Sequence, residues 1–273
     1  MPFQTHFACL VTVTLGFSVT VAEGAALGGG HISQVNHDVR FRNAQTGWTA
    51  ARLNAAFNDG SIQTGAESRA EIAFSEQTVV RLGDKTRLDI ESGNRVIELI
   101  SGAILTQVPS GVGGTTVQVR NITATATGAT MAIESLPKAY TKFIVLDGTS
   151  RLCLKKDTWA SDCVLLRAGQ MLIAGPNAKA LPDAVDVDLR RLVETCQFIT
   201  EFPKLPGQER VTRAAAAQAR DKSQGGFADT NLVIHGRGTL VNVTKSNGAG
   251  ANPGTTSPAK PTASPKLSPT PPR

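Results

Sequence analysis

Aromatic residues are scarce in this chain: they make up 5% of its 273 residues, with one Tyr and two Trp. A surface that binds sugars or nucleic-acid bases by stacking needs several flat rings. The net charge of +6 is spread along the chain and mixed with Asp and Glu. A positive charge excess of this size, spread along the chain, indicates charged side chains that are solvated and not a continuous basic stripe that binds phosphates. We therefore expect no nucleic-acid partner.

The one long apolar run lies near the N-terminus. Residues 7–22 read "FACLVTVTLGFSVTVA", and small residues follow them. This run is short for a membrane-spanning helix, which needs about 20 apolar residues. We predict that residues 1–26 are a signal peptide or a short anchor, which places the rest of the protein in the periplasm or outside the cell. No Lys or Arg precedes the run, so an uncleaved anchor and a misassigned start codon stay open as alternatives.

Cysteine is rare, with four residues in the whole chain. Cys9 would leave with the signal peptide. Cys153 and Cys163 flank "LKKDTWASD" and are predicted at facing positions of two short strands, where a disulfide can form in an oxidising compartment. Two reduced thiols are the alternative. Cys196 would stay unpaired as a small core residue on a helix.

The residue patterns of common catalytic and metal sites are missing. His31 and His37 have a separation that fits neither helix-face nor short-loop metal ligands, and the cysteine pair lacks zinc-site spacing. There is no Gly-x-Ser-x-Gly sequence, and Cys163 has no histidine partner. The "GVGGTT" segment at 111–116 lacks the Lys-Ser/Thr of a phosphate cradle. We therefore expect no catalytic residue, no metal and no cofactor, and no enzyme activity.

Paired-carboxylate hydrolysis stays open, because two acidic side chains can meet from distant parts of a chain. Glu71, Asp89 and Glu98 are predicted on the solvated faces of strands, which explains them without chemistry. An envelope polysaccharide hydrolase is therefore an alternative function.

Apolar residues alternate with polar ones over much of the chain, between turns spaced about nine residues apart. Ala70, Ile72 and Phe74 share one face, and Leu88 with Ile90 repeats the pattern after the turn at 83–84. A period of two predicts strands, and regularly spaced short strands predict an all-β core. We expect a β-sandwich or a β-solenoid-like stack of short hairpins over residues 27–181.

The composition changes after residue 181. The pattern from Asp183 predicts a helix with Asp183 as its N-cap and with an apolar face formed by Leu189, Leu192, Val193, Cys196 and Ile199. A second, mostly exposed helix is predicted in "QERVTRAAAAQARDK", and two late strands in "NLVIHGRGTLVNVT". Residues 182–245 are thus expected to form a helical extension with late strands. Residues 246–273, rich in Pro, Thr, Ser and Lys, are expected to be a disordered tail.

Five blocks of the sequence resemble the FecR domain, in order and spacing, over about residues 52–175. They are "GSIQTGAESRAEIAFSEQTVVRLGDKTRLDI", "IELISGAILTQVP", "ATATGATMAI", "KFIVLDGTSRL" and "LLRAGQML". The positions that match the family pattern are Thr64, Gly65, Ser68, Arg69, Ala70, Glu71, Arg81, Leu82, Gly83, Gly102, Ala103, Gly128, Gly148, Ala168, Gly169 and Gln170. The matching glycines are explained by backbone geometry.

The resemblance implies an extracytoplasmic all-β domain. Better-known members of the family are envelope-spanning regulators that relay a signal from an outer-membrane TonB-dependent receptor to a cytoplasmic anti-sigma segment. About six residues precede the apolar run here, which leaves no room for that segment. We expect a non-enzymatic binding or scaffold protein whose partner is an envelope protein or a cell-wall component. A periplasmic signalling component that regulates a sigma factor through a receptor or a separate partner is the alternative.

Overall fold

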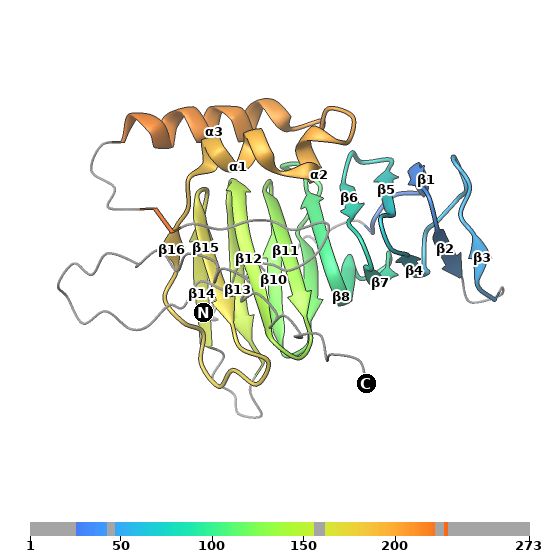
Figure 1. Ribbon diagram of the computed structural model, residues 1–273, viewed down its shortest axis with the longest axis horizontal. Helices are drawn as coiled ribbons and strands as arrows, with labels where there is room; N and C mark the ends of the chain where they lie inside the picture. Colours follow the sequence, from blue (N-terminus) through green and yellow to red (C-terminus); the bar gives the residue numbers. More distant parts are fainter. Residues whose placement is uncertain (1–25, 43–46, 156–161, 222–226, 229–273) are drawn as a thin grey trace, which may run out of the picture. The chain divides into compact units, whose positions relative to one another are not determined.

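The structure is a computed structural model that describes residues 26–42, 47–155, 162–221 and 227–228 (Figure 1). The described part is mostly β, with 49% of its residues in strands and 13% in helices, which confirms the expected all-β core with a C-terminal helical extension. The predicted signal segment lies almost wholly outside the described residues. The late strands and the C-terminal tail also lie outside them.

The strands form two sheets that share one strand. Sheet A contains, in spatial order, β1 (Gly30–Asn36), β5 (Arg69–Phe74), β6 (Val79–Leu82), β8 (Val96–Gln107), β11 (Thr130–Leu136), β12 (Tyr140–Asp147), β15 (Gln170–Ala174) and β16 (Val185–Asp186). Sheet B contains β3 (Thr49–Ala50), β2 (Val39–Arg42), β4 (Gly60–Thr64), β7 (Arg87–Glu91), β8, β9 (Thr115–Val119), β10 (Ile122–Ala126), β13 (Thr149–Leu154) and β14 (Asp162–Arg167). Every pairing in the two sheets is antiparallel except that of β8 with β9.

Strand β8 passes from one sheet to the other at Gly102. Its first half, to Ser101, pairs with β7 and β9 in sheet B, and its second half pairs with β6 and β11 in sheet A. Gly102 has a φ of +93°, and a Cβ at this position would lie 2.4 Å from the Cα of Thr86. The corner therefore requires glycine, both for its backbone conformation and for space.

The main core lies between the two sheets, and a second core lies on the other face of sheet A. On β12, Phe143 and Val145 point into the main core, whereas Ile144 and Leu146 belong to the second one. Sheet A is therefore buried on both faces. Sheet B keeps the alternation of a half-exposed sheet, as in β9, where Val117 and Val119 are buried and Gln118 is not.

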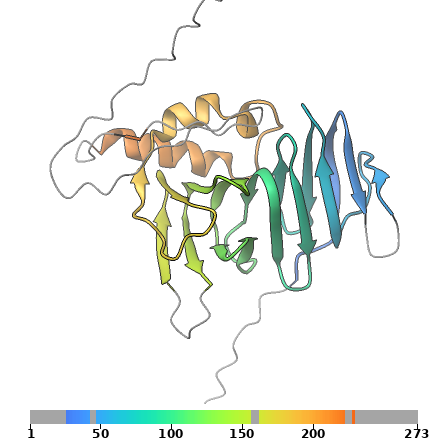
Figure 2. The ribbon, with the colours of Figure 1, turned by 60° about the horizontal axis from the view of Figure 1, so that its bottom comes forward.

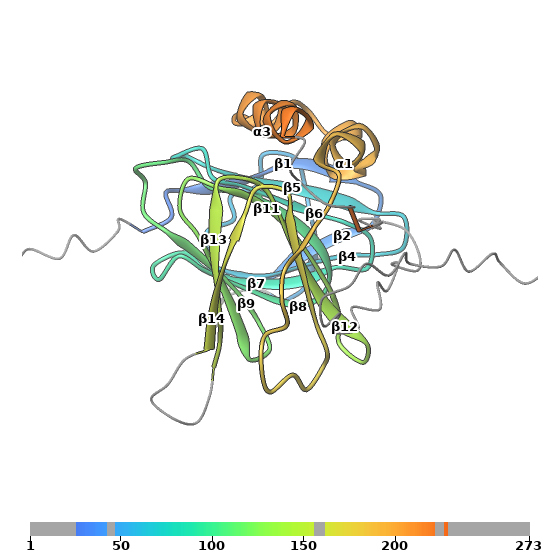
Figure 3. The same ribbon diagram turned by 90° about the vertical axis from the view of Figure 1, so that its left-hand side faces the viewer.

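Three helices form the layer that covers sheet A: α1 (Leu189–Thr195), α2 (Gln197–Thr200) and α3 (Gln208–Arg220). We call residues 188–221 the helical layer. Figure 3 shows α1 and α3 side by side above the strands of sheet A, with β7 and β9 of sheet B beneath. Figure 2 shows the helices packed over the strands from another side. The protein is thus a β-sandwich with helices packed on one outer face.

The first helix differs from its prediction in two ways. Asp183 is not its N-cap, because the chain first adds β16 to the edge of sheet A, and Asp188 caps α1 by accepting a hydrogen bond from Arg191 N at 3.1 Å. The helix also ends at Cys196, where the backbone is extended (φ −72°, ψ 115°) before α2 begins. The second helix was predicted correctly.

The predicted solvation of Glu71 is wrong. Glu71 is only 7% exposed, and Arg81, its neighbour on the adjacent strand, is 1% exposed. The alternation placed both residues correctly on the face opposite Ala70 and Ile72, but the helical layer covers that face. Asp89 and Glu98, on sheet B, are half-buried.

Candidate interaction site

A buried ion pair lies where the helical layer meets sheet A. Glu71 on β5 and Arg81 on β6 face each other in the strand register. The Arg81 Nε donates to Glu71 Oε2 at 2.7 Å, and the two side chains are 1% and 10% exposed. Ser33 Oγ donates to the other carboxylate oxygen at 2.7 Å. Glu71 is thus held from two neighbouring strands, with its charge matched by Arg81.

The guanidinium of Arg81 also forms hydrogen bonds with the helical layer. Its Nη1 donates to the carbonyl oxygen of Phe198 in α2, and its Nη2 donates to that of Pro203. The guanidinium carbon lies 4.9 Å from the ring centroid of Phe202. Burial lowers the pKa of the Arg81 guanidinium, and the hydrogen bond and charge of Glu71 oppose this change. Arg81 therefore joins β6 to the segment between α2 and α3.

Further polar contacts attach the segment between α2 and α3, and the first turn of α3, to sheet A. Arg69 forms an ion pair with Glu201, and Gln107 Oε1 accepts from Gly207 N at 2.8 Å. Arg210 Nε donates to Asp147 Oδ2 at 2.8 Å. Arg69, Gln107 and Asp147 lie on three different strands, β5, β8 and β12, so these contacts fix the position of the layer on sheet A.

The outer side of the layer has an apolar groove between α1 and α3. Its volume is about 330 Å³. Val193 and the alanines at 215, 216 and 219 provide its walls, with Arg190, Glu194 and Thr212 also lining it. Alanine side chains are short, so the backbone of α3 is accessible to a close neighbour. We call this surface the helix groove.

The predicted exposure of the basic residues of α3 is correct only in part. Arg213 and Arg220 are exposed. Arg210, by contrast, is bound to Asp147 and serves to attach the helix to β12. The charged face of α3 is therefore smaller than its sequence indicates.

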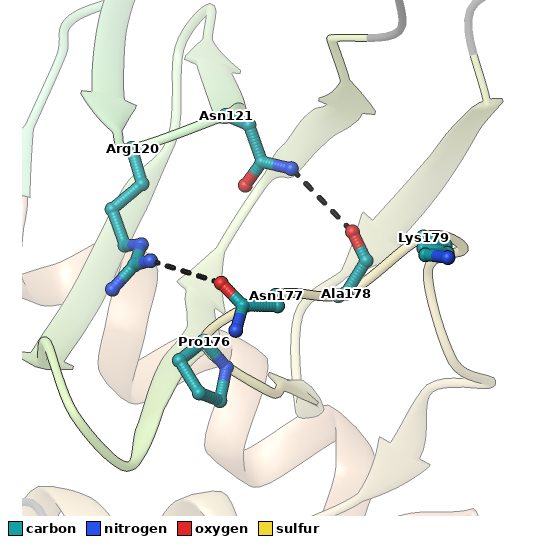
Figure 4. Close-up of a pocket in the computed structure, with 6 residues that line it drawn as sticks. All are labelled: Arg120, Asn121, Pro176, Asn177, Ala178 and Lys179. Atoms are coloured by element: carbon teal, nitrogen blue, oxygen red, sulfur yellow. Dashed lines mark hydrogen bonds between the residues drawn. The ribbon is translucent and has the colours of Figure 1, made fainter.

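A second hollow lies at the end of the sandwich, between the β9–β10 turn and the segment after β15. Figure 4 shows its six lining residues: Arg120, Asn121, Pro176, Asn177, Ala178 and Lys179. Its volume is about 350 Å³. We call it the loop pocket. The sequence analysis did not single out these residues, because the turn and the loop are more than fifty positions apart.

Metal ligands do not gather among the described residues. In the part of the chain that the structure describes, no three side chains of the His, Cys, Asp and Glu types lie close enough to hold an ion. His31 is exposed on β1, and His37 Nδ1 lies 2.6 Å from the carbonyl oxygen of Glu67. His6 and His235 lie outside the described residues. No helix of the described residues is long and apolar enough to cross a membrane.

Cys153 and Cys163 are joined by a disulfide between β13 and β14. They are ten positions apart, so the bond closes a small loop at the edge of sheet B. Replacing both with serine should lower the free energy of unfolding by about 2–3 kcal/mol, because the unfolded chain gains the freedom that the loop had removed. Chemical denaturation with and without a reducing agent measures this. The reducing agent should destabilise the wild type and leave the double variant unchanged; an unaffected wild type would contradict the prediction.

Cys196 is a buried free thiol between α1 and α2. Burial raises its pKa from 9.0 to about 11, against smaller opposing effects of the Phe198 and Ile199 amides and of Arg81. The thiol therefore loses its proton at lower pH in the unfolded chain than in the folded one. Its contribution to stability is complete below pH 9 and is lost as the pH rises to 11.

We therefore expect the free energy of unfolding to fall by about 2 kcal/mol more in the wild type than in Cys196→Ala between pH 8.5 and 11. Denaturant titrations of both proteins at several pH values measure the difference. Parallel pH profiles for the two proteins would contradict this assignment.

Comparison with known proteins finds a family match within the sandwich. Residues 60–151 match the family model described as FecR protein, which confirms the resemblance drawn from the sequence. The match runs from β4 into β13. The helical layer lies outside it.

Two solved structures are similar to about half of the chain. Both are crystal structures of a protein from Parabacteroides distasonis described as a "putative anti-sigma factor", at 2.50 and 1.65 Å resolution. The TM-scores are 0.41 and 0.40, with 10% sequence identity, 52% of this chain covered and 74% of the other. No curated protein matches the chain.

Proposed function

We propose that this protein is a non-enzymatic binding component of the cell envelope, in which the FecR sandwich supports the helical layer as a face for a protein partner. The observation that carries the proposal is the way the layer is attached. Arg81, Gln107 and Asp147 hold it from below, so the helix groove on its outer side has a fixed shape. A preformed surface loses little conformational freedom when a partner binds.

The environment of the buried acids supports a role without catalysis. Glu71 and Glu134 are the buried carboxylates of the described residues. Each is paired with a cation, Glu71 with Arg81 and Glu134 with Lys142. Hydrolysis by paired carboxylates needs two acids that share one cleft, and these two acids are bound in separate ion pairs.

The proposal includes export. The apolar run at 7–22 and the disulfide both fit an oxidising compartment. Fractionation of cells followed by N-terminal sequencing of the mature protein tests this part. A full-length protein in the cytoplasm would contradict it.

Site-specific photocrosslinking tests the binding role. A photoreactive residue at Ala216 or Ala219, in the helix groove, should give one discrete crosslinked protein in intact cells. The matched control is Glu91, an exposed residue on β7 of sheet B, which should give none. The purified protein should also fail to hydrolyse peptidoglycan, so that the turbidity of a peptidoglycan suspension stays unchanged when the protein is added. The absence of a discrete adduct at both groove positions, or turnover of peptidoglycan, would overturn the proposal.

Regulation of a sigma factor is the second candidate function, and the FecR domain at 60–151 favours it. Under this alternative, the partner at the helix groove is a membrane-spanning signalling protein. Deletion of the gene should then change transcription from a single sigma-factor regulon. Unchanged transcript levels across the genome would leave the scaffold role as the better account.

A further inference from the structure

The loop pocket is lined by two segments at one end of the sandwich. Arg120 and Asn121 form the β9–β10 turn, and the residues at 176–179 follow β15. Arg120 Nη1 donates to the carbonyl oxygen of Pro137, in the turn between β11 and β12. The pocket is thus held together by contacts between segments that are far apart in the sequence.

The side chains of the pocket are placed by hydrogen bonds (Figure 4). Arg120 Nη2 lies 3.5 Å from Asn177 Oδ1, and Asn121 Nδ2 donates to the carbonyl oxygen of Ala178 at 3.4 Å. Each of these contacts joins the turn to the opposite loop. The guanidinium of Arg120 is therefore held at one side of the pocket, although the residue is exposed to solvent.

The charge of the lining has one sign. Arg120 and Lys179 line the pocket, and among the described residues no acidic side chain lines it. The backbone of Lys155 is next to it, since Lys155 N donates to Asn121 O at 2.7 Å, and Lys138 directly follows Pro137. The carboxylate of Asp162, at the start of β14, accepts from Leu181 N at 3.2 Å. The described lining of the pocket therefore presents positive charge to solvent.

The backbone of Arg120 has a positive φ, a conformation that glycine adopts more easily than arginine. Arg120 has a φ of +58° and is the first of two residues between Val119 and Ile122. Such turns favour glycine at that position, because L-residues with positive φ are strained. Replacing Arg120 with glycine removes the charge together with the contacts to Pro137 and Asn177, in a turn that glycine adopts without strain.

We propose that the loop pocket binds a small anionic ligand through a phosphate or carboxylate group. The N–H groups of Arg120 that do not contact Pro137 O and Asn177 Oδ1 can donate to such a group, and Lys179 adds a second charge from the opposite loop. Pro176 and Ala178 offer an apolar wall for the rest of the ligand. The volume suits a molecule the size of a sugar phosphate. This site goes beyond the proposed function and shares no residue with the helix groove.

Isothermal titration calorimetry of the purified chain at low salt tests the proposal, with glucose 6-phosphate, inorganic phosphate, acetate and glucose as probes. We expect saturable binding of glucose 6-phosphate that weakens with added salt. Arg120→Gly should weaken it at least about tenfold and Lys179→Gln several-fold. The matched control is Lys85→Gly, which removes one positive charge from an exposed turn residue with a φ of +48° in the β6–β7 turn.

The probes also separate the sources of the anion. Tighter binding of glucose 6-phosphate than of inorganic phosphate supports a phosphorylated sugar, equal binding supports a free or terminal phosphate, and binding of acetate alone supports a carboxylate. Arg120→Gly should unfold at the same denaturant concentration as the wild type or higher, so its loss of binding is not a loss of fold. The proposal is overturned by glucose binding as tightly as glucose 6-phosphate, by no binding of any anion, or by wild-type affinity in Arg120→Gly.

Discussion

Replacing Arg81 with alanine lowers the free energy of unfolding by about 3–5 kcal/mol, the range measured when one partner of a buried ion pair is removed. The variant leaves the carboxylate of Glu71 buried without its cation. It also leaves the carbonyl oxygens of Phe198 and Pro203 without the donor that Arg81 provides. Urea denaturation of the purified variant measures the loss. Limited proteolysis should cut first between α2 and α3, because that segment loses its attachment to β6.

Two further variants distinguish the loss of the buried ion pair from any general effect of arginine removal on stability. Arg40→Ala breaks an ion pair with Asp38 whose side chains are 56% and 61% exposed, and it should change stability by less than about 0.5 kcal/mol. Replacing both members of the buried pair, as Glu71→Leu with Arg81→Met, should recover part of the loss, because no unpaired charge remains. A loss below about 1 kcal/mol in Arg81→Ala would show that the layer does not depend on this contact.

Replacing Gly102 with alanine destabilises the protein by about 3–5 kcal/mol, from strained backbone and overpacking together. The new Cβ would lie 2.4 Å from both the Cα and the Oγ1 of Thr86. Thr86 cannot move away easily, because its hydroxyl both accepts from Ala103 N and donates to Ala103 O, each at 3.0 Å. The expected result is a lower midpoint of denaturation or a loss of soluble protein.

The matched control is Gly111→Ala. Gly111 also has a positive φ, +84°, but no atom lies within 4 Å of the position of its Cβ. It should therefore show only the backbone strain, about 1–2 kcal/mol. Equal losses in the two variants would mean that the contact with Thr86 is unimportant and that β8 can bend without it.

The fold class was predictable because strand period and turn spacing are local signals. Leu88 and Ile90 alternate with charged residues in the sequence, and β7 has the same alternation of buried and exposed side chains. The matches to the family pattern also point to structure. Among them, Gly102 forms the corner of β8, and Glu71 with Arg81 forms the buried ion pair.

The burial of Glu71 and Arg81 was not predictable from the strand pattern. Alternation tells which residues share a face, but it does not tell what covers that face. The cover comes from residues more than a hundred positions later in the chain, where the carbonyl groups of Phe198 and Pro203 carry no signal in the sequence. Residues of opposite charge on adjacent predicted strands are a signal that could have suggested a pair.

The two hollows were missed for a similar reason. The loop pocket depends on the turn at Arg120 meeting the loop at Asn177, and no local pattern records that contact. The helix groove depends on the position of α1, which the sequence placed too early because Asp183 resembles an N-cap. The disulfide partners were easier to anticipate, since the two cysteines flank a short turn between neighbouring strands.

The shared strand β8 gives the domain a particular response to force. Its last residue, Gln107, accepts a hydrogen bond from Gly207 in the helical layer, and its first half belongs to sheet B. A force applied to the helices would therefore be transmitted to sheet B along the continuous backbone of β8. A domain connected in this way should resist tension as a unit and then unfold in a single step.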